Sequence, residues 1–455
     1  MIIRRVSRQK LLLLLGDILI VDLSVVLAHF LRLKKHLVFT DWNRRLVTLV
    51  FLLVIYIISF YIFDLYNVRQ KFRRIRTVVL VFGSLILVAL ITTVFFYIFP
   101  YRVGRGIFLI SLVPIAVLIT TWRWFFFLVF RLTVPQRNVL IVGISKKARD
   151  LGAFLDKNDE YRVIGFISEK RPKEGELGSK LWGDAKSLKK LVYDYNVHDI
   201  VLASEPVGDR KMIRALMNCK LWGVKITDTA RFYEHLLNKL PVKDIDEEWV
   251  LKSEGFNYVG SRMYDRIKRL MDLAISLLIL IVTVPVGVII ALGIKLNSKG
   301  PVFFNQERVG KHYKPFKLLK FRTMILNSED GVPQWAEKND LRVTGFGRIL
   351  RKMRMDELPQ LLNVMKGQMS LIGPRPEREY FVNKLINDVP YYSLRFSVKP
   401  GLTGWAQVNY RYGASVEDAI EKLQYELYYI KNMSILLDLR IILKTFRIML
   451  FGLGR

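Results

Sequence analysis

Four long apolar runs occupy the first third of this 455-residue chain, and each is close to the length that crosses a lipid bilayer. They lie at about residues 11–31, 46–66, 78–99 and 107–130. The first run is too long, and the others follow it too closely, for it to be a cleaved signal peptide. The sequence therefore predicts a membrane protein that begins with a four-helix transmembrane bundle, residues 1–135.

The chain is not membrane-embedded throughout, because 24% of its residues are charged although 52% are apolar. Lysine and arginine number 71 against 40 acidic residues, and the formal charge of +31 suits anionic partners. Together with the apolar runs, this charge favours phospholipid headgroups and phosphorylated substrates, and we expect no nucleic acid as a partner. The single cysteine, Cys219, excludes an intrachain disulfide.

Basic residues flank the apolar runs and bear on their orientation. The start of the chain and the segment after the second run are both basic, which favours the cytoplasm for both. The segment between the first two runs is basic as well, so the asymmetry is only partial. We expect both ends of the four-span unit to lie in the cytoplasm.

Short apolar runs alternate with helical stretches over residues 136–235, as they do in a small parallel α/β domain. The run Asn138-Val-Leu-Ile-Val-Gly143 predicts a buried strand that ends in a glycine turn. The next segment lacks the second and third glycines of a dinucleotide-binding loop, so a structural turn and a nucleotide site both stay open. We predict a Rossmann-like domain with a regulatory or oligomerising role, and a homodimer is one expected use of it.

A linker, residues 236–262, leads to a fifth apolar run at about residues 270–296. This run is either a fifth transmembrane helix or a re-entrant helix that bends in the bilayer and returns to the same face. Pro285, near its middle, favours a break in the helix, and strongly basic flanks on both sides favour the re-entrant form. A last helix, at about residues 434–451, mixes apolar and basic residues as interfacial helices do.

Two adjacent acids, Asp356 and Glu357, follow two arginines and precede a proline. Neighbouring side chains on a helix diverge by about 100°, so the two carboxylates would not share one proton. Separate roles suit them better: one as a nucleophile that forms an acyl phosphate, the other as a ligand for a hard divalent cation. Taken alone, such a pair more often marks an acidic helix surface.

Basic and rigid motifs accompany the acid pair. Arg375 lies between two prolines, which restrict its backbone and could aim its guanidinium at a phosphate. Lys320 and Arg322, in Lys320-Phe-Arg-Thr-Met324, are further positions suited to phosphate. Two more segments add basic or polar groups: Gln306-Glu-Arg-Val-Gly310, and the rigid turn from Lys399 to Gln407.

These motifs together resemble a known family. From about Ser261 to its end, the chain is similar to the bacterial sugar transferases, the polyprenyl-phosphate phosphoglycosyl transferases of the monotopic type. One departure is Gln368, where the family usually has an acid. The four-span front end and the Rossmann-like middle resemble the long form of the family, found in exopolysaccharide and O-antigen initiation. The matching motifs are Lys268-Arg-Leu-Met-Asp272, Gly300-Pro-Val-Phe-Phe304, Lys320 to Met324, Arg351 to Gln360, Asn363-Val-Met-Lys-Gly367, Met369 to Pro376, and Lys399 to Val408.

The resemblance implies an undecaprenyl-phosphate sugar phosphotransferase in the bacterial inner membrane. Residues 263–455 would form an α-rich, membrane-associated catalytic domain on the cytoplasmic face, with the break of its re-entrant helix at Pro285. The enzyme would transfer a hexose-1-phosphate from a UDP-sugar to polyprenyl (undecaprenyl) phosphate and release UMP, as the first membrane step of exopolysaccharide, O-antigen or capsule synthesis.

The resemblance also implies roles for individual residues. Asp356 would attack the β-phosphate of the donor and carry the phosphosugar until the polyprenyl phosphate attacks it in turn. Glu357 would hold Mg²⁺, the implied cofactor. The other residues implied in substrate binding are Arg351, Arg375, Lys320, Arg322 and Gln407, with Lys268, Arg269 and Asp272 at the start of the re-entrant helix.

Two other functions stay open. A non-catalytic scaffold of a polysaccharide assembly complex would keep the architecture and tolerate the loss of Asp356. A membrane-anchored nucleotide-sugar dehydratase would need a complete glycine-rich loop and a Tyr-x-x-x-Lys pair. The spacing from Tyr264 to Lys268 matches that pair, but it lies at the membrane helix and not after a nucleotide-binding fold.

Overall fold

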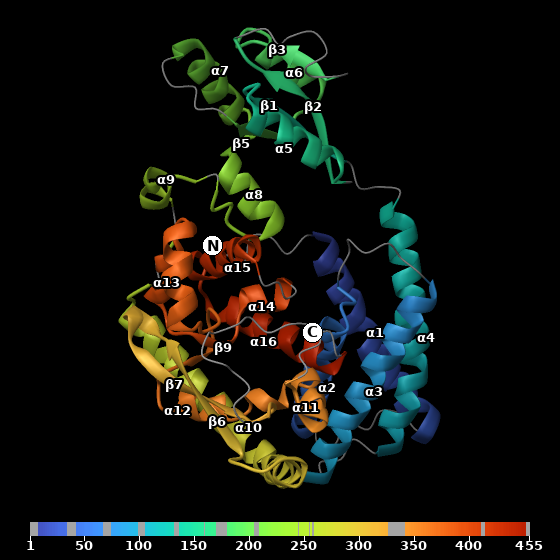
Figure 1. The fold of residues 1–455 in the computed structure, drawn as a ribbon. Coiled ribbons are helices and arrows are strands. Elements are labelled where there is room, and N and C mark those ends of the chain that lie inside the picture. The colour runs from blue at the N-terminus through green and yellow to red at the C-terminus, as the bar shows by residue number, and fades with distance from the viewer. Residues whose placement is uncertain are drawn as a thin grey trace. The chain divides into compact units, whose positions relative to one another are not determined.

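The computed structural model divides the chain into two compact units (Figure 1). One unit is Met1–Val134 with Leu443–Phe451, and the other is Pro135–Ile442 with Gly452–Arg455. The structure describes residues 8–33, 42–66, 74–98, 105–131, 136–158, 160–169, 180–203, 209–243, 245–253, 255–256, 259–325, 342–410 and 415–451.

The first unit contains the four predicted membrane helices. Three of them are long and apolar enough to cross a membrane, whereas the apolar part of α2 that is described, Leu49–Ile62, is shorter. Buried Asp17 and Arg123 form an ion pair of 2.6 Å inside the bundle, so charge is not confined to its ends. The helices are α1 (Arg8–Leu33), α2 (Trp42–Ile62), α3 (Arg74–Ile98) and α4 (Arg105–Arg131).

The second unit begins with the predicted Rossmann-like domain. Its five strands form one sheet in the order β3-β2-β1-β4-β5, and every neighbouring pair is parallel. Alternate residues of β1 face opposite sides of the sheet: Ile141 packs with α5 and α8, and Leu140 with α6 and α7. The elements are β1 (Arg137–Val142), α5 (Lys146–Asp156), β2 (Tyr161–Ile167), β3 (Leu181–Gly183), α6 (Leu188–Asp194), β4 (Asp199–Leu202), α7 (Arg210–Leu221), β5 (Lys225–Asp228) and α8 (Thr229–Leu237).

The turn after β1 has the glycine conformation that the sequence predicts. Gly143 has φ +108°, a conformation that side chains rarely adopt, and Ser145 then caps α5 by accepting a hydrogen bond from the Ala148 N–H. These contacts give Gly143 a structural role in the turn, and the alternative of a nucleotide site stays open.

The middle domain is tied to the rest of the second unit through α8. The Glu234 carboxylate receives Lys431 Nζ at 2.7 Å and Asn432 Nδ2 at 2.9 Å, and both partners of the ion pair are buried. The Lys431 ammonium also lies 4.4 Å from the centre of the Trp249 ring. The segment predicted as a linker contains the short helix α9 (Glu247–Lys252).

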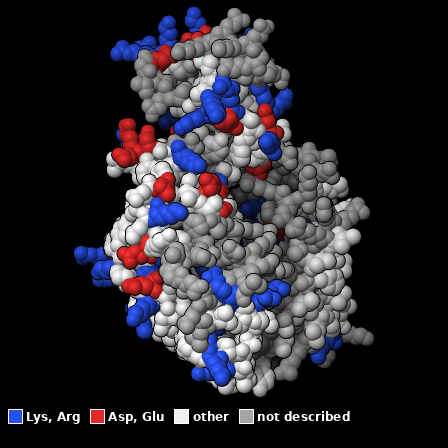
Figure 2. All heavy atoms as spheres, viewed as in Figure 1, with Lys and Arg blue, Asp and Glu red and all other residues white. Residues whose placement is uncertain are grey.

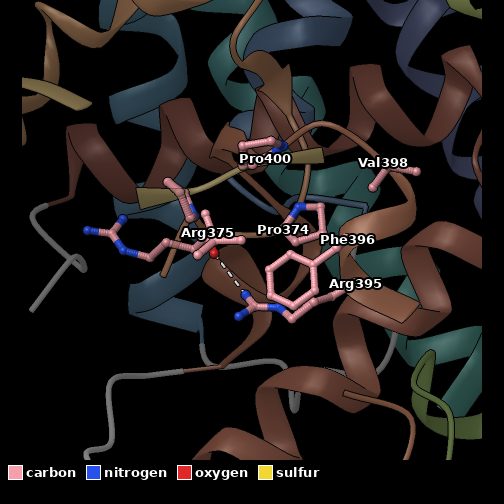
Figure 3. A pocket seen from close by; sticks show the side chains of 9 residues that line it. Pro374, Arg375, Arg395, Phe396, Val398 and Pro400 are labelled. Atoms are coloured by element: carbon pink, nitrogen blue, oxygen red, sulfur yellow. Dashed lines mark hydrogen bonds between the residues drawn. The ribbon is translucent and has the colours of Figure 1, made fainter. Parts of the chain in front are cut away.

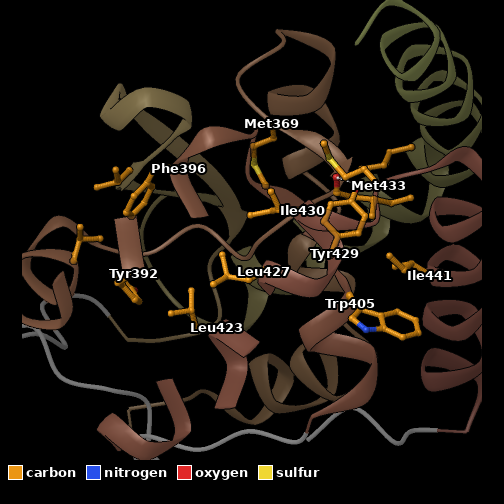
Figure 4. Close-up of a cluster of buried hydrophobic side chains, with 14 of the residues drawn as sticks. Met369, Tyr392, Phe396, Trp405, Leu423, Leu427, Tyr429, Ile430, Met433 and Ile441 are labelled. Carbon is orange, nitrogen blue, oxygen red and sulfur yellow. Dashed lines mark hydrogen bonds between the residues drawn. The ribbon is translucent and has the colours of Figure 1, made fainter. Parts of the chain in front are cut away.

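The remaining part of the second unit is mostly helical, as predicted, with two small sheets. Strands β6 and β7 form an antiparallel hairpin, and β8 and β9 are parallel. Figure 4 shows the apolar core, in which Met369, Leu427 and Ile430 are fully or nearly fully buried. The elements are α10 (Arg262–Asn297), β6 (Phe303–Val309), η2 (Lys311–Tyr313), β7 (Pro315–Phe321), α11 (Gly345–Lys352), η3 (Met355–Glu357), α12 (Gln360–Met365), β8 (Ser370–Ile372), α13 (Glu379–Asp388), η4 (Tyr392–Ser397), β9 (Gly401–Thr403), α14 (Trp405–Asn409) and α15 (Val416–Lys431). The last helix, α16 (Ile435–Leu450), belongs to this unit up to Ile442, and its residues from Leu443 belong to the first unit.

Helix α10 contains the fifth apolar run and is one 36-residue helix. It continues on both sides of Pro285, so the predicted break does not interrupt it, and by length and composition it too could cross a membrane. Both of its halves nevertheless pack on the same unit: Ile275 lies against the main core, and Ile290 and Ile294 pack with Phe321 of β7. Its outward face exposes Leu277, Leu278, Ile281, Val282, Val288 and Ile289.

Candidate active site

The acid pair lies in a tight turn between two helices. After α11 ends at Lys352, Arg354 takes a left-handed conformation with φ +55°, and the chain turns through η3 to place Asp356 and Glu357 inward. Only 8% of Asp356 and 9% of Glu357 remain exposed. Because buried carboxylates are rare unless they are paired or functional, these side chains are not the acidic surface that an isolated pair would suggest.

Glu357 is surrounded by cations. Its Oε1 accepts a hydrogen bond from Arg375 Nη2 at 2.9 Å and lies 3.9 Å from Lys320 Nζ, and its Oε2 lies 3.8 Å from Arg354 Nη1. Burial alone would raise the pKa of Glu357, but the three cations outweigh it and lower the pKa to about 2. Glu357 is therefore a permanent anion near neutral pH.

Asp356 has a different environment. Within the described residues, its carboxylate has no hydrogen bond and no ion pair. Burial and the neighbouring charge of Glu357 raise its pKa, against the opposing effect of Lys320, Arg351 and Arg375. The two acids thus differ in environment: Glu357 is held by cations, whereas Asp356 has no such partner among the described residues. Their roles as metal ligand and nucleophile stay predictions.

A small cavity opens beside the pair and is lined by Arg308, Lys320, Gln360 and Arg375 among others. Lys320 follows Leu318 on one face of β7, which directs its ammonium toward the acids. Burial, opposed by Glu357, lowers the pKa of Lys320 to about 8. On the face that Figure 2 shows, lysines and arginines are scattered and do not form one patch. The cavity is distinguished by the three cations among its lining residues, Arg308, Lys320 and Arg375.

The segment that carries Arg375 packs unusually closely against its neighbour. A Cβ on Gly373 would lie 2.4 Å from the Lys399 carbonyl oxygen, and one on Gly404 would lie 2.2 Å from the Gly373 oxygen. Only glycine allows this approach of β8 and β9. Figure 3 shows Pro374, Pro400 and Phe396 close together, with the side chain of Arg375 extending away from them.

The other arginines predicted near the site have structural partners. Arg351 Nε donates to Thr323 Oγ1 at 2.9 Å, and Arg351 is close enough to lower the pKa of Asp356. Arg322 is buried and donates through Nη2 to the Ser298 carbonyl and hydroxyl oxygens, at the end of α10. Its Nε and Nη1 are buried and have no hydrogen-bond partner among the residues that the structure describes.

Three predicted residues at the start of α10 fasten this helix to the domain. Lys268 Nζ lies 2.7 Å from Asp438 and 3.1 Å from the Tyr429 hydroxyl. Arg269 donates to the carbonyl oxygens that end α12, and Asp272 accepts the Leu371 N–H at 3.0 Å. The structure thus engages all three in packing contacts and does not bring them to the acid pair; their role in substrate binding stays a prediction.

Gln407 also has a local contact, because its Nε2 donates to the Leu402 carbonyl at 3.3 Å. Within the described part of the chain, its Oε1 is buried and accepts no hydrogen bond. Its role in binding likewise stays a prediction.

The residues around the acid pair suit a cation shared with a phosphate better than a complete protein site. Over the described ranges, no three His, Cys, Asp or Glu residues are grouped as metal ligands. Mg²⁺ commonly binds through one or two carboxylates, retained waters and substrate phosphates. Asp356 and Glu357 provide such carboxylates next to a cationic cavity, so the donor set fits that mode.

Sequence reasoning missed several neighbours of the acid pair. In the sequence, Arg354 and Gln360 stand out only as members of the motif Arg351 to Gln360. In the structure, Arg354 contacts Glu357 and Gln360 lines the cavity. Arg395 and Glu426 were missed altogether. They are 31 residues apart and belong to no local motif, so only the folded chain reveals their contact.

Comparisons with known proteins agree with this architecture. A family described as bacterial sugar transferase matches residues 263–452, and one described as CoA-binding domain matches residues 61–227. The chain is 40% identical over 241 residues to UDP-N-acetylgalactosamine-undecaprenyl-phosphate N-acetylgalactosaminephosphotransferase of Aeromonas hydrophila, covering 53% of this chain and 56% of that protein.

Two further relatives are named UDP-glucose:undecaprenyl-phosphate glucose-1-phosphate transferase. The one from Escherichia coli is 42% identical over 297 residues, 63% of this chain and 61% of that protein. The one from Caulobacter vibrioides is 41% identical over 180 residues, 39% of this chain and 67% of that protein. The chain spans between about half and two thirds of the length of these relatives. With the acid pair inside the matched region, the chain belongs to the bacterial sugar transferase family.

Proposed function

We propose that this chain transfers a hexose-1-phosphate from a UDP-sugar to polyprenyl (undecaprenyl) phosphate, giving polyprenyl-diphosphate-sugar and UMP. This would be the first membrane step of exopolysaccharide, O-antigen or capsule synthesis. The observation that carries the proposal is the buried carboxylate of Asp356, which has no hydrogen bond or ion pair among the described residues. Its neighbour Glu357 contacts Lys320 and Arg375, which line a small cavity together with Arg308. Converging cations of this kind suit a diphosphate, whose charge they offset during transfer.

The proposed reaction has two displacements at one phosphorus. A carboxylate oxygen of Asp356 attacks the β-phosphorus of the donor, the bond to the oxygen that bridges the two phosphates breaks, and UMP leaves with that oxygen. An oxygen of the acceptor phosphate then attacks the same phosphorus, and the bond to Asp356 breaks, which restores the carboxylate. Each step makes one P–O bond and breaks another, so no oxidant or external base is required.

The proposed cofactor is Mg²⁺, held by Glu357 together with donor phosphates. When bound, the ion would offset charge on the phosphate oxygens. Glu357 suits this role because its pKa of about 2 keeps it anionic, and the described residues leave its Oε2 without a hydrogen bond. Arg375 and Lys320 fix its orientation.

The packing of α10 supports catalysis at one membrane face. Both halves of this apolar helix pack on the same unit, which supports a re-entrant placement with both of its ends on one side of the bilayer. In the continuous helix, the bend that this placement needs would lie at Pro285. We propose that this side is the cytoplasmic face of the bacterial inner membrane, where UDP-sugars are made. The lipid acceptor would reach the acid pair along the exposed apolar face of α10.

UMP release tests the proposed function directly. The full chain, in detergent or nanodiscs with Mg²⁺ and undecaprenyl phosphate, is incubated with UDP-glucose, UDP-galactose and their N-acetylated counterparts in turn. Several donors are tested because the relatives named above differ in their sugar. We expect UMP and a lipid-linked sugar from at least one of them. Folded protein that releases no UMP from any of these donors would reject the proposal and favour the scaffold.

Lys320 predicts how activity depends on pH. With a pKa of about 8, its ammonium is charged below that pH and is lost as the pH rises through it. We therefore expect the KM for the donor to rise above about pH 8. In Lys320→Arg the cation persists, so this rise should disappear while the enzyme still turns over. A KM with the same pH dependence in both proteins would show that Lys320 does not bind the donor.

A further inference from the structure

Arg375 lies in a segment with few backbone N–H donors, because its neighbours Pro374 and Pro376 have none. The backbone of Arg375 hydrogen-bonds to the Glu426 carboxylate, and the carbonyl oxygens of the segment accept further hydrogen bonds. The Pro374 oxygen accepts the Gly401 N–H at 2.8 Å, and the Pro376 oxygen accepts Arg308 Nη1 at 3.3 Å. The oxygen of Arg375 itself accepts Nη2 of Arg395 at 2.8 Å, as Figure 3 shows.

Arg395 is itself held on every side. Its Nε and Nη2 each donate to Glu426 at 2.9 Å, a two-pronged ion pair, and its Nη1 donates to the Tyr392 hydroxyl at 2.7 Å. Its guanidinium carbon also lies 5.6 Å from the centre of the Phe396 ring. Arg395 and Glu426 are each only 5% exposed. These partners hold the planar guanidinium of Arg395 in a single orientation.

The far end of this chain of contacts is the acid pair. Arg375 Nη2 donates to Glu357 Oε1 at 2.9 Å, and Glu357 is the neighbour of Asp356. Glu426 therefore fixes Arg395, Glu426 and Arg395 both fix the backbone of Arg375, and the side chain of Arg375 fixes Glu357. Neither Arg395 nor Glu426 lines the cavity beside the acids.

We propose that Arg395 and Glu426 are a positioning pair that sets the guanidinium of Arg375 for the donor diphosphate. This inference rests on the proposed function for its substrate, but the contacts assign the pair to Arg375 whatever the sugar is. Lysine at position 395 would still neutralise Glu426. A lysine ammonium lacks the planar fork of a guanidinium. It therefore cannot donate two parallel hydrogen bonds to Glu426 and a third to the Arg375 carbonyl oxygen.

A double-mutant cycle separates positioning from general support of the fold. Arg395→Lys, Arg375→Ala and the double variant are compared in the full chain, by kcat/KM for UMP release and by the Kd for UDP. We expect Arg395→Lys alone to lower kcat/KM about 100-fold, since small misplacements of binding groups cost this much. In the Arg375→Ala background, the same change should cost little more, because its target is already gone.

The matched control is Glu234→Gln. It removes the charge of one partner of another buried ion pair in the same unit, Glu234 with Lys431. We expect it to lower the Tm but to leave kcat/KM unchanged. Where Arg395→Lys fails to fold, Glu426→Gln replaces it, because the amide keeps one acceptor oxygen and loses the charge.

The outcomes are distinct. Losses from Arg395→Lys and Arg375→Ala that multiply in the double variant would overturn the positioning role, as would a similar loss in Glu234→Gln. A wild type that releases no UMP but binds UDP, with a non-additive cycle in Kd, would overturn the proposed function and keep this inference. A wild type that neither releases UMP nor binds UDP would overturn both.

Discussion

Asp356→Asn is expected to lower UMP release by about 1,000-fold or more, as the loss of a covalent nucleophile does in other enzymes. The amide has nearly the same size as the carboxylate but is a poor nucleophile. The fold should survive, because the described residues provide no hydrogen bond or ion pair to this carboxylate. The substitution also removes the negative charge of Asp356, which burial and repulsion by Glu357 disfavour. The measurement is the initial rate of UMP release at saturating donor.

A second measurement detects the covalent intermediate on Asp356. With donor labelled in the sugar and no acceptor, wild-type protein should retain label after denaturation, and Asp356→Asn should retain none. Asp388→Asn is the matched control, because Asp388 is an exposed acid at the end of α13. Release of UMP by Asp356→Asn at the wild-type rate would show that another group attacks, or that the acceptor attacks the donor directly.

The membrane and Rossmann-like parts of the fold could be predicted because their signals are local. A run such as residues 107–130 has no soluble alternative at its length, and β1 ends in the glycine turn that its sequence indicates. The β6–β7 hairpin was not predicted. Its strands expose Phe303 and Phe304 and carry charge where alternation would place apolar residues, so the period-two signal is weak.

The candidate site was predictable where the residues belong to motifs. Lys320 and Arg375 do converge on Glu357, although they are 55 residues apart in the chain. The motifs could not separate residues that face the cavity from residues that support it. Lys268 and Arg269 carry the same charge as Lys320, but they are engaged by Asp438 and by backbone carbonyls. The partner of each cation is determined by tertiary packing, so it cannot be predicted from the pattern of charges in the sequence.

Glu357→Gln is expected to lower kcat by about 100-fold without raising the KM for the donor, by analogy with the loss of one preorganised electrostatic group. The amide cannot offset Arg375, Lys320 and Arg354, so these cations remain free to hold the donor diphosphate. The pKa of Asp356 should fall, because the like charge beside it is gone. Binding of the donor therefore survives, while the orientation of the metal and the arginine is lost.

The dependence on Mg²⁺ distinguishes the two roles that Glu357 combines. If Glu357 holds the ion, Glu357→Gln should need about 10- to 100-fold more Mg²⁺ for half-maximal rate, in the range that loss of a metal contact costs. If Glu357 only orients Arg375, the Mg²⁺ requirement stays that of the wild type and kcat alone falls. Glu379→Gln, at an exposed position in the first turn of α13, is the matched control and should change neither quantity. If Glu357→Gln changes neither kcat nor the Mg²⁺ requirement, Glu357 takes no part in the chemistry. Its buried contacts with three cations would then serve the fold alone.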